Sequence, residues 1–349
     1  MSRCIRGAVF PLLVLTGLAR LALAAPPLVA VVAHNDGTET TDFLVPFNVL
    51  SRAGVGQVVA VSLRAGPVEL HPALAIEVDE TLADFDARHP NGADFVIVPA
   101  VIDPEAPALR RWLREQAKKG ATLVSICDGA WVLAHAGVLD GRAATTHWYS
   151  RDSIGEQFPN VRWARDRRWL DAGSVVSTTG VSASIPVSLA LIERIAGRER
   201  ALAVASSLGV GDWDPAHDSD AFGLSAGHVW TAARNGASVW SHERVGIPVA
   251  DGVDEASLAL VADALARTWR STPVALASAP RVMTRYGLRL ATSEAPVDRT
   301  LALPRTDSPA VPYLEFALAD IERHYGAATA DFVALQLEYA RAGHARAAR

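Results

Sequence analysis

The fold is decided by the stretch Leu123-Val124-Ser125-Ile126-Cys127-Asp128-Gly129-Ala130-Trp131-Val132-Leu133-Ala134. An apolar, strand-like segment ends in small-x-Cys-x-Gly, and a helical pattern begins at once. This is typical of a nucleophile elbow, a strand-to-helix turn so tight that only small neighbours fit, which presents one side chain outward. The unpaired N–H groups at the start of the helix favour thiolate over thiol, so the pattern predicts a reactive Cys127. The alternative is a buried, inert cysteine, which is the commoner fate of a lone thiol.

Strand-like and helical patterns alternate on either side of this stretch. We expect strands at 28–33, 58–63, 95–99 and 121–126, and helices at 45–53, 108–118 and 130–136. Such a succession of βα units predicts an α/β fold with a mainly parallel sheet and helices on both faces. Active sites in these sheets lie at the carboxyl ends of the strands, which is where Cys127 falls.

The first 24 residues have the pattern of a signal peptide. Arg3 and Arg6 form a basic start, an apolar stretch follows, and Ala22-Leu23-Ala24 gives the small-x-small pattern that a signal peptidase cuts. We therefore expect a periplasmic or secreted protein, with an uncleaved anchor as the alternative because Arg20 interrupts the apolar stretch. No later run is long and apolar enough to span a bilayer, so we expect no membrane span in the mature chain.

The charge balance argues against a nucleic-acid partner. The whole chain holds 33 basic and 38 acidic residues, a net charge of −5. Removal of residues 1–24 takes away three arginines and no acid, which leaves 30 basic residues and a net charge of −8. A nucleic-acid-binding protein needs a basic face. The same cleavage removes Cys4 and leaves Cys127 alone, so no intramolecular disulfide can form.

Several separated motifs give the chain a specific resemblance. The elbow Ser125-Ile126-Cys127-Asp128-Gly129 is followed by Ala134-His135-Ala136-Gly137-Val138-Leu139-Asp140-Gly141-Arg142-Ala143-Ala144-Thr145-Thr146-His147-Trp148. These motifs resemble the ThiJ/PfpI family of the class I glutamine-amidotransferase-like superfamily, nearest to isonitrile hydratases and to the amidotransferase-like domain of AraC-type regulators. The resemblance covers about residues 28–210 and implies a flavodoxin-like sandwich. It says less about the reaction, because the family includes hydrolases, hydratases, deglycases, chaperones and non-catalytic sensors.

The resemblance also assigns two partners to Cys127. In the family, the acid that hydrogen-bonds the cysteine precedes a helix with a Pro-x-x-Val pattern, and Asp42 before Pro46 is the match here, with Glu39 as second choice. Such an acid must donate its proton or act through water as a general base. The alternative for Asp42 is a helix N-cap. His147 matches the family histidine and is expected either to act as a general base or to hydrogen-bond a strand end and fill space.

The resemblance further implies an oxyanion hole built from the backbone N–H groups of Asp128 and Ala100. Val98-Pro99-Ala100-Val101 stands where the family has a Pro-Gly-Gly turn, so both glycines are replaced. An Asp128 carboxylate that faces the sulfur opposes thiolate formation, whereas one that faces solvent has little effect. Trp131 and Trp148 are expected to wall an apolar pocket, with core packing or a subunit interface as the alternative.

The C-terminal part contains a repeat of the first part. Ten of the 20 positions from 189 to 208 recur without a gap 129 positions later, from 318 to 337. The segments 245–249, 255–269 and 273–278 also follow the strand-helix-strand order of the opening. We therefore expect a ThiJ/PfpI-like domain at 27–210, a solvated connector at 211–244 and a degenerate partial repeat at 245–349 that lacks the nucleophile. The repeat predicts an intramolecular pseudo-dimer, with a homodimer as the alternative.

These patterns lead to two hypotheses about function. The first is an exported cysteine-dependent enzyme, a hydrolase or hydratase that acts on a C–N bond of a small molecule through Cys127, Asp42 and His147. The second is a non-catalytic module that senses a ligand or an oxidant in the same pocket. We expect no cofactor and no metal, because His217, His228 and His242 have no recognised ligand spacing.

Overall fold

The structure of this chain is a computed structural model that describes residues 25–78, 80–304 and 311–341, the side chains of residues 311 and 312 excepted. The predicted signal peptide at 1–24 lies outside the described residues. Among the described helices, none has the length and apolar character that crossing a membrane requires.

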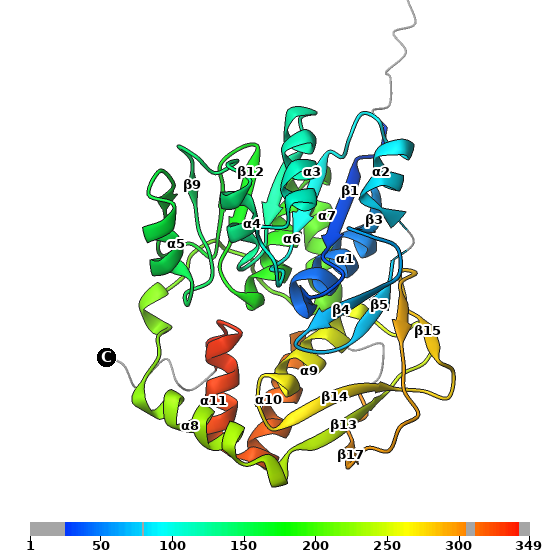
Figure 1. The fold of residues 1–349 in the computed structure, drawn as a ribbon, viewed down its shortest axis with the longest axis vertical. Coiled ribbons are helices and arrows are strands. Elements are labelled where there is room, and N and C mark those ends of the chain that lie inside the picture. The colour runs from blue at the N-terminus through cyan, green and yellow to red at the C-terminus, as the bar shows by residue number, and fades with distance from the viewer. Residues whose placement is uncertain (1–24, 79, 305–310, 342–349) are drawn as a thin grey trace, which may run out of the picture.

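A seven-stranded sheet forms the centre of the first half, as Figure 1 shows. The strand order is β11-β12-β8-β7-β1-β3-β6, and every neighbouring pair is parallel except β11 with β12. The strands are β1 (Leu28–Ala33), β3 (Gln57–Ser62), β6 (Glu80–Thr81), β7 (Phe95–Val98), β8 (Thr122–Ser125), β11 (Trp169–Asp171) and β12 (Val175–Thr178). The expected α/β fold with a mainly parallel sheet is therefore confirmed.

Helices cover both faces of this sheet because the side chains of each strand alternate between two cores. In β1, Val29 and Val31 enter one core, whereas Ala30 and Val32 enter the other. The first core is covered by α1 (Thr40–Ala53), α6 (Ser184–Ala196) and α7 (Arg198–Leu208). The second is covered by α2 (Leu82–Arg88), α3 (Pro107–Lys118) and α4 (Gly129–His135). The segment between α4 and β11 contains β9 (Ala143–Ala144), α5 (Arg151–Gln157) and β10 (Arg162–Trp163).

The expected elements lie within about two residues of the observed ones, with one exception. The helix predicted at 45–53 begins at Thr40, five residues earlier. Its N-cap is Glu39, whose side chain accepts a hydrogen bond from the Asp42 N–H group. The alternative that made Asp42 the N-cap is therefore wrong. The added turn brings Asp42 to the start of the helix, close to the carboxyl ends of the central strands.

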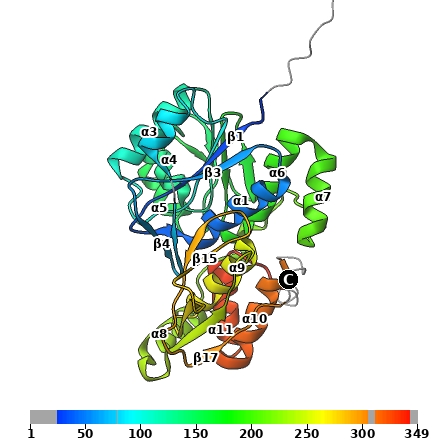
Figure 2. The ribbon, with the colours of Figure 1, turned by 90° about the vertical axis from the view of Figure 1, so that its right-hand side faces the viewer.

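The second half builds a smaller sheet and also extends the first half (Figure 2). Its own parallel sheet has the order β14-β13-β17, from β13 (Glu243–Pro248), β14 (Ser271–Leu276) and β17 (Arg299–Thr300). Two further strands, β15 (Arg281–Met283) and β16 (Arg289–Ala291), pair with each other, and β16 adds to a hairpin of the first half. That hairpin consists of β4 (Pro67–His71) and β5 (Ala75–Glu77), with β2 (Thr38–Glu39) beside β4.

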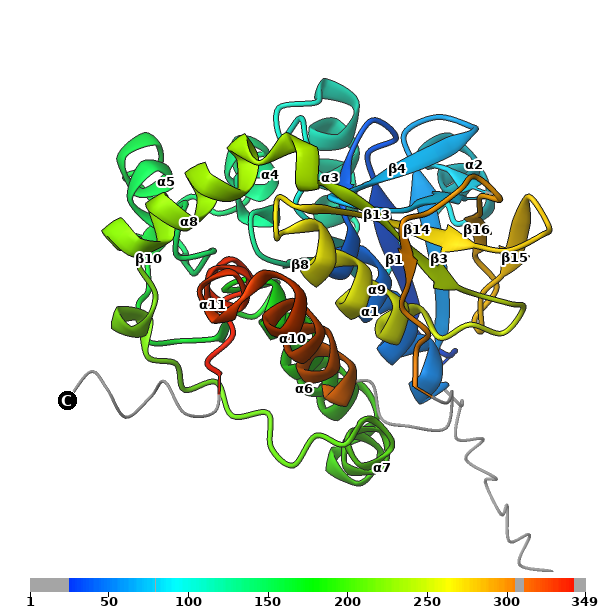
Figure 3. The same ribbon diagram turned by 90° about the horizontal axis from the view of Figure 1, so that it is seen from below.

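The helices of the second half pack on those of the first half. Helix α9 (Glu255–Ala266) lies against α1, as the view from below shows (Figure 3). Beyond it come α10 (Val311–Tyr325) and α11 (Ala327–Gln336). The break between α10 and α11 falls at Gly326 (φ 87°, ψ 161°), and the break between α6 and α7 falls at Gly197 (φ 84°, ψ 167°). The two helix pairs that share sequence therefore also share the conformation of their junction.

The packing of α1 on α9 is nearly symmetric. Arg52 from α1 pairs with Asp254 at the N-cap of α9, and Arg267 at the end of α9 pairs with Glu39 at the N-cap of α1. Each pair joins an arginine at a helix C-terminus to the acid that caps the facing helix. One of these two pairs, Arg267 with Glu39, lies in the candidate site.

The expected connector at 211–244 is not merely solvated chain. It contains α8 (Ala226–Ala237), which packs against α11. The side chain of Asn235 is buried there and donates to the Thr268 carbonyl oxygen and to the Thr329 hydroxyl. The composition of this segment did not predict α8, because its apolar residues Val229 and Trp230 are exposed. Its buried Asn235 contacts the rest of the chain through polar groups.

Candidate active site

Cys127 occupies the tight turn between β8 and α4. Its φ is +53°, a left-handed value that is rare for a residue other than glycine. Two neighbours hold the turn. The Cys127 N–H donates to the Thr178 hydroxyl at 3.1 Å, and Gly129 packs so closely that an added Cβ would lie 2.0 Å from the Val98 carbonyl oxygen. The local geometry is that of the predicted elbow, at the carboxyl end of the central strand. The side chain is nonetheless buried, with 6% of the residue exposed.

Asp42 is a fully buried acid at the start of α1. Its Oδ2 accepts a hydrogen bond from the Ala100 N–H at 3.2 Å, and its Oδ1 has no hydrogen-bond partner among the described residues. Burial raises the pKa of the Asp42 carboxyl to about 7, although the bond from Ala100 acts in the opposite direction. The negative charge of Asp42 also raises the pKa of the Cys127 thiol. The acid assigned from the family pattern therefore lies in electrostatic reach of the sulfur.

The Ala100 backbone does not form the expected oxyanion hole in this state. Its N–H group is directed to Asp42, and its carbonyl oxygen accepts from the Glu39 N–H at 2.8 Å. A donor that already binds a carboxylate cannot stabilise a substrate oxyanion until that carboxylate moves or is protonated. In this conformation the Ala100 N–H group, which the resemblance assigns to the oxyanion hole, binds Asp42 instead.

Glu39 anchors a buried ion cluster that the sequence did not reveal. The guanidinium of Arg267 donates from Nη2 to Glu39 Oε1 at 2.7 Å and from Nε to Asp263 Oδ1 at 2.6 Å. Thr41 also donates to Asp263, at 2.8 Å. Burial raises the pKa of Glu39 well above its usual range, with the charges of Asp263 and Asp42 adding to the rise. Because Arg267 and Asp263 belong to α9 and its C-terminus, the second half completes the site.

The surroundings of Cys127 oppose ionisation of its thiol. Burial raises the pKa of Cys127 well above its ordinary value, and the negative charges of Asp42, Asp128 and Glu39 raise it further. Arg267 is the positive group that acts in the opposite direction. In this structure burial and three nearby acidic groups therefore favour the thiol over the thiolate expected at the start of α4.

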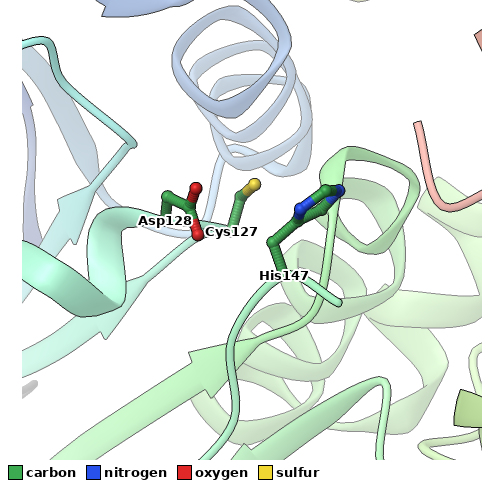
Figure 4. Close-up of side chains that lie close together, drawn as sticks. All are labelled: Cys127, Asp128 and His147. Carbon is green, nitrogen blue, oxygen red and sulfur yellow. The ribbon is translucent and has the colours of Figure 1, made fainter. Parts of the chain in front are cut away.

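Asp128 faces the sulfur rather than solvent. A carboxylate oxygen of Asp128, a ring nitrogen of His147 and the Cys127 sulfur all lie within 4.8 Å of one another (Figure 4). The two carboxylate oxygens accept hydrogen bonds from Thr146 at 3.3 Å and from Ser150 at 2.8 Å. These hydroxyls hold the carboxylate beside the thiol.

Both ring nitrogens of His147 already have partners. Nε2 lies 3.2 Å from the Gln336 carbonyl oxygen, and Nδ1 accepts from the Tyr149 N–H at 3.3 Å. This pattern places the proton on Nε2, because a carbonyl oxygen can only accept and a backbone N–H can only donate. The lone pair is then on Nδ1. A ring nitrogen of His147 lies within 4.8 Å of the sulfur, and the ring is also a contact point for a distant part of the chain.

That distant part is the segment 335–338, which we call the strap. The strap crosses the site at the C-terminal end of α11: the Leu335 carbonyl accepts from the Trp148 indole at 3.0 Å, and Gln336 contacts His147. Glu338 Oε2 accepts from the Gly180 N–H at 2.6 Å, and Glu338 Oε1 lies 2.8 Å from His217 Nε2. Gly180 has no room for a Cβ, which would lie 2.6 Å from Glu338. The strap is therefore fitted closely against Gly180 and the loop that carries His147.

The expected pocket is displaced from Cys127. A cavity of about 1080 Å³ lies beside the site, bordered by the first half and by the strap, and neither Cys127, Trp131, Trp148 nor Glu39 lines it. Its walls include Val181, Ile185, His217, Leu260, Leu335 and Glu338. Trp131 instead packs on His135 and Phe158, which is the alternative of core packing.

Removal of the Glu338 side chain is expected to expose the thiol. The change Glu338→Ala leaves the buried Gly180 N–H and His217 without their acceptor, which costs about 1–3 kcal/mol in the closed state. The rate of Cys127 alkylation should then rise about 5- to 150-fold, because the open form becomes that much more populated. Peptide mass spectrometry of the iodoacetamide adduct measures this rate. Glu294→Ala, at an exposed acid, is the control and should leave the rate unchanged; equal rates for both variants would contradict the strap.

Several known proteins are similar to the half of the chain that contains Cys127. Residues 28–194 match the DJ-1/PfpI family, and the chain belongs to that family, whose motifs the sequence resembles. The HTH-type transcriptional regulator CdhR of Pseudomonas aeruginosa is 32% identical over 161 residues, which cover 45% of this chain and 46% of the regulator. Isonitrile hydratase of Pseudomonas putida is 29% identical over 174 residues, which cover 48% of this chain and 72% of the hydratase.

Other relatives extend the range of proteins that share the domain. The Parkinson disease protein 7 homolog of Danio rerio is 27% identical over 51% of this chain and 95% of that protein. Among solved structures, Drosophila melanogaster DJ-1beta is 25% identical with a TM-score of 0.48, over 53% of this chain and 99% of that one. The relatives thus include an enzyme by name, DJ-1 proteins and regulators, and the chain spans less than half the length of the CdhR regulator.

Proposed function

We propose that this chain uses Cys127 as a nucleophile toward a small uncharged molecule, in hydration or hydrolysis of a C–N bond. The observation that carries the proposal is the strained thiol beside a buried acid. A residue other than glycine at φ +53° costs on the order of 1–3 kcal/mol, and such strain persists where the surrounding structure enforces it, often at functional sites. Asp42, with a pKa of about 7 and one unpartnered oxygen, is suited to exchange a proton near neutral pH.

The proton path follows from these two groups. As the sulfur bonds to the carbon of the C–N group, the S–H proton passes to the Asp42 carboxylate and from there to the substrate. In hydrolysis the C–N bond then breaks and the amine leaves with that proton, whereas in hydration the nitrogen stays bonded to the carbon. Water adds to the same carbon, the C–S bond breaks, and the sulfur regains a proton from that water. Asp42, Asp128 and Glu39 give the site a negative surplus, so an anionic substrate is disfavoured. Hydration of an uncharged group also fits the relative named isonitrile hydratase.

Substitution of Cys127 and of Asp42 tests this proposal. Cys127→Ser should abolish turnover in a screen of amides, nitriles, isonitriles and dicarbonyls, and Asp42→Asn should lower the rate about 100-fold or more because the proton acceptor is lost. In the unmodified chain the rate should rise with pH through about 7, as Asp42 loses its proton, and Asp42→Asn should remove that rise. Asp140→Asn, at an exposed acid, is the control. Full turnover by Cys127→Ser would refute the proposal.

One observation favours a second function, that of a ligand- or oxidant-sensing module. The strap closes the site, and the Ala100 N–H is occupied by Asp42, so the closed state lacks both access and a complete oxyanion hole. Such a module should show no turnover on any compound of the screen, while a bound ligand or mild oxidant changes the alkylation rate of Cys127. The same screen therefore separates the two functions.

A further inference from the structure

Three potential metal ligands converge at the elbow. The Cys127 sulfur, a carboxylate oxygen of Asp128 and a ring nitrogen of His147 lie within 4.8 Å of one another. Figure 4 shows the Cys127 sulfur between the Asp128 carboxylate and the nearer ring nitrogen of His147, with Cys127 and Asp128 from the elbow and His147 from the loop before α5. Ideal tetrahedral zinc sites hold such atoms about 3.5 Å apart, so a metal would draw them together by at most about 1.3 Å.

Hydrogen bonds fix the tautomer of His147 and the orientation of the Asp128 carboxylate. A histidine that ligates a metal usually donates its other ring N–H to a carbonyl or carboxylate, which fixes the tautomer and the ring. Nε2 of His147 has such a partner in the Gln336 carbonyl, whereas the lone pair of Nδ1 accepts from the Tyr149 N–H at 3.3 Å, a hydrogen bond that a metal would replace. The Asp128 carboxylate is oriented in the same way by the hydroxyls of Thr146 and Ser150.

The charge around the cluster favours a cation. The carboxylates of Asp42, Asp128 and Glu39 surround the thiol, and the nearby guanidinium of Arg267 is shared between Glu39 and Asp263. A thiolate, an imidazole and a carboxylate are ligands of Zn²⁺ and of Co²⁺, whereas Mg²⁺ and Ca²⁺ prefer oxygen alone. The chemistry of the donor set therefore selects a transition metal.

We propose that Cys127, Asp128 and His147 bind a divalent transition-metal ion such as Zn²⁺, with water as the fourth ligand. Binding replaces the S–H bond by an S–metal bond and releases the thiol proton to solvent. The inference goes beyond the proposed function, since metal-bound Cys127 is not available as a nucleophile, so the metal-bound form is inactive. From the sequence we expected no metal, because His217, His228 and His242 have no recognised ligand spacing, and Cys127, Asp128 and His147 were not considered together.

Cobalt spectroscopy tests the site without any substrate. The full chain carrying Cys4→Ser, reduced with a phosphine and stripped of metal, is titrated with Co²⁺. We expect one equivalent to bind, with a sulfur-to-cobalt charge-transfer band and the visible bands of tetrahedral coordination, and we expect Zn²⁺ to displace it. Cys127→Ser should lose the charge-transfer band. His147→Gln and Asp128→Asn should each weaken Co²⁺ binding about 10-fold or more. His71→Gln and Asp140→Asn, at exposed positions, are matched controls and should bind as the parent does.

A second readout does not depend on the spectrum. Zn²⁺ should slow the alkylation of Cys127 in the parent and in both controls, but not in His147→Gln, and circular dichroism establishes that this variant is folded. A charge-transfer band that persists in Cys127→Ser, or equal affinity in all variants, would overturn the site, as would the absence of binding to the reduced chain. If the unmodified chain shows no turnover in the C–N screen but binds cobalt, the proposed function alone is refuted. The two failures are therefore distinguishable.

Discussion

Gly129→Ala is expected to lower the free energy of unfolding by about 3 kcal/mol or more. A Cβ at this position would lie 2.0 Å from the Val98 carbonyl oxygen and 3.0 Å from that of Pro99. Both are backbone atoms of the strand end beside the elbow, so no flexible side chain can move aside, and overpacking of this kind costs about 1–3 kcal/mol, occasionally more. Urea-induced unfolding followed by circular dichroism measures the loss.

Gly155→Ala is the matched control, since Gly155 also lies in a seven-residue helix but has room for a methyl group. An added Cβ there would meet the Trp163 ring at 3.6 Å, an ordinary contact. Alanine in a helix stabilises by about 0.5–1 kcal/mol relative to glycine, so this variant should be as stable as the parent or slightly more so. If Gly129→Ala behaved like Gly155→Ala, the close packing of the elbow on β7 would be disproved.

Arg267→Met is expected to lower the free energy of unfolding by about 3–5 kcal/mol. The substitution leaves Glu39 and Asp263 as buried carboxylates without their shared guanidinium, and removal of one partner of a buried ion pair typically costs this much. The same unfolding measurement applies. Because Arg267 joins the second half to the N-cap of α1, the loss should also separate the two halves in proteolysis before the first half unfolds.

A second substitution and a surface pair separate the ionic effect from the loss of packing. Glu39→Gln combined with Arg267→Met removes one of the orphaned charges and should recover about half of the lost stability. Arg281→Met breaks an exposed pair with Glu77 and should cost about 1 kcal/mol or less. If Arg281→Met and Arg267→Met cost the same, the buried cluster would contribute nothing beyond an ordinary surface contact.

The sequence was sufficient to predict the first half because its signals are local. The alternation of strands and helices and the Cys-x-Gly turn depend on neighbouring residues, so the sheet and the elbow at Cys127 are where we expected them. The position of Asp42 next to the central strands also follows from a short motif. The strap beside the elbow could not be predicted in this way, because it lies 208 residues or more beyond Cys127 along the chain.

The parts of the site that local patterns did not predict also come from distant segments of the chain. Arg267, Asp263 and Gln336 have no local pattern that marks them, and their roles follow only from the packing of α9 and α11 on the first half. One signal was present: the repeat of 189–208 at 318–337 predicted that the second half would pack on the first. The repeat did not predict that Gly197 and Gly326 share one backbone conformation between their helices. Nor did it predict that Arg267 of the second half pairs with Glu39.

The separation along the chain between Cys127 and the strap sets the order of events when the protein is made. Cys127 emerges during synthesis long before Gln336 and Glu338 exist. Until the strap is synthesised, the contacts of Gln336 to His147 and of Glu338 to Gly180 are missing beside the elbow. The surroundings of the thiol therefore reach their final form only after more than half of the chain has followed it out of the ribosome.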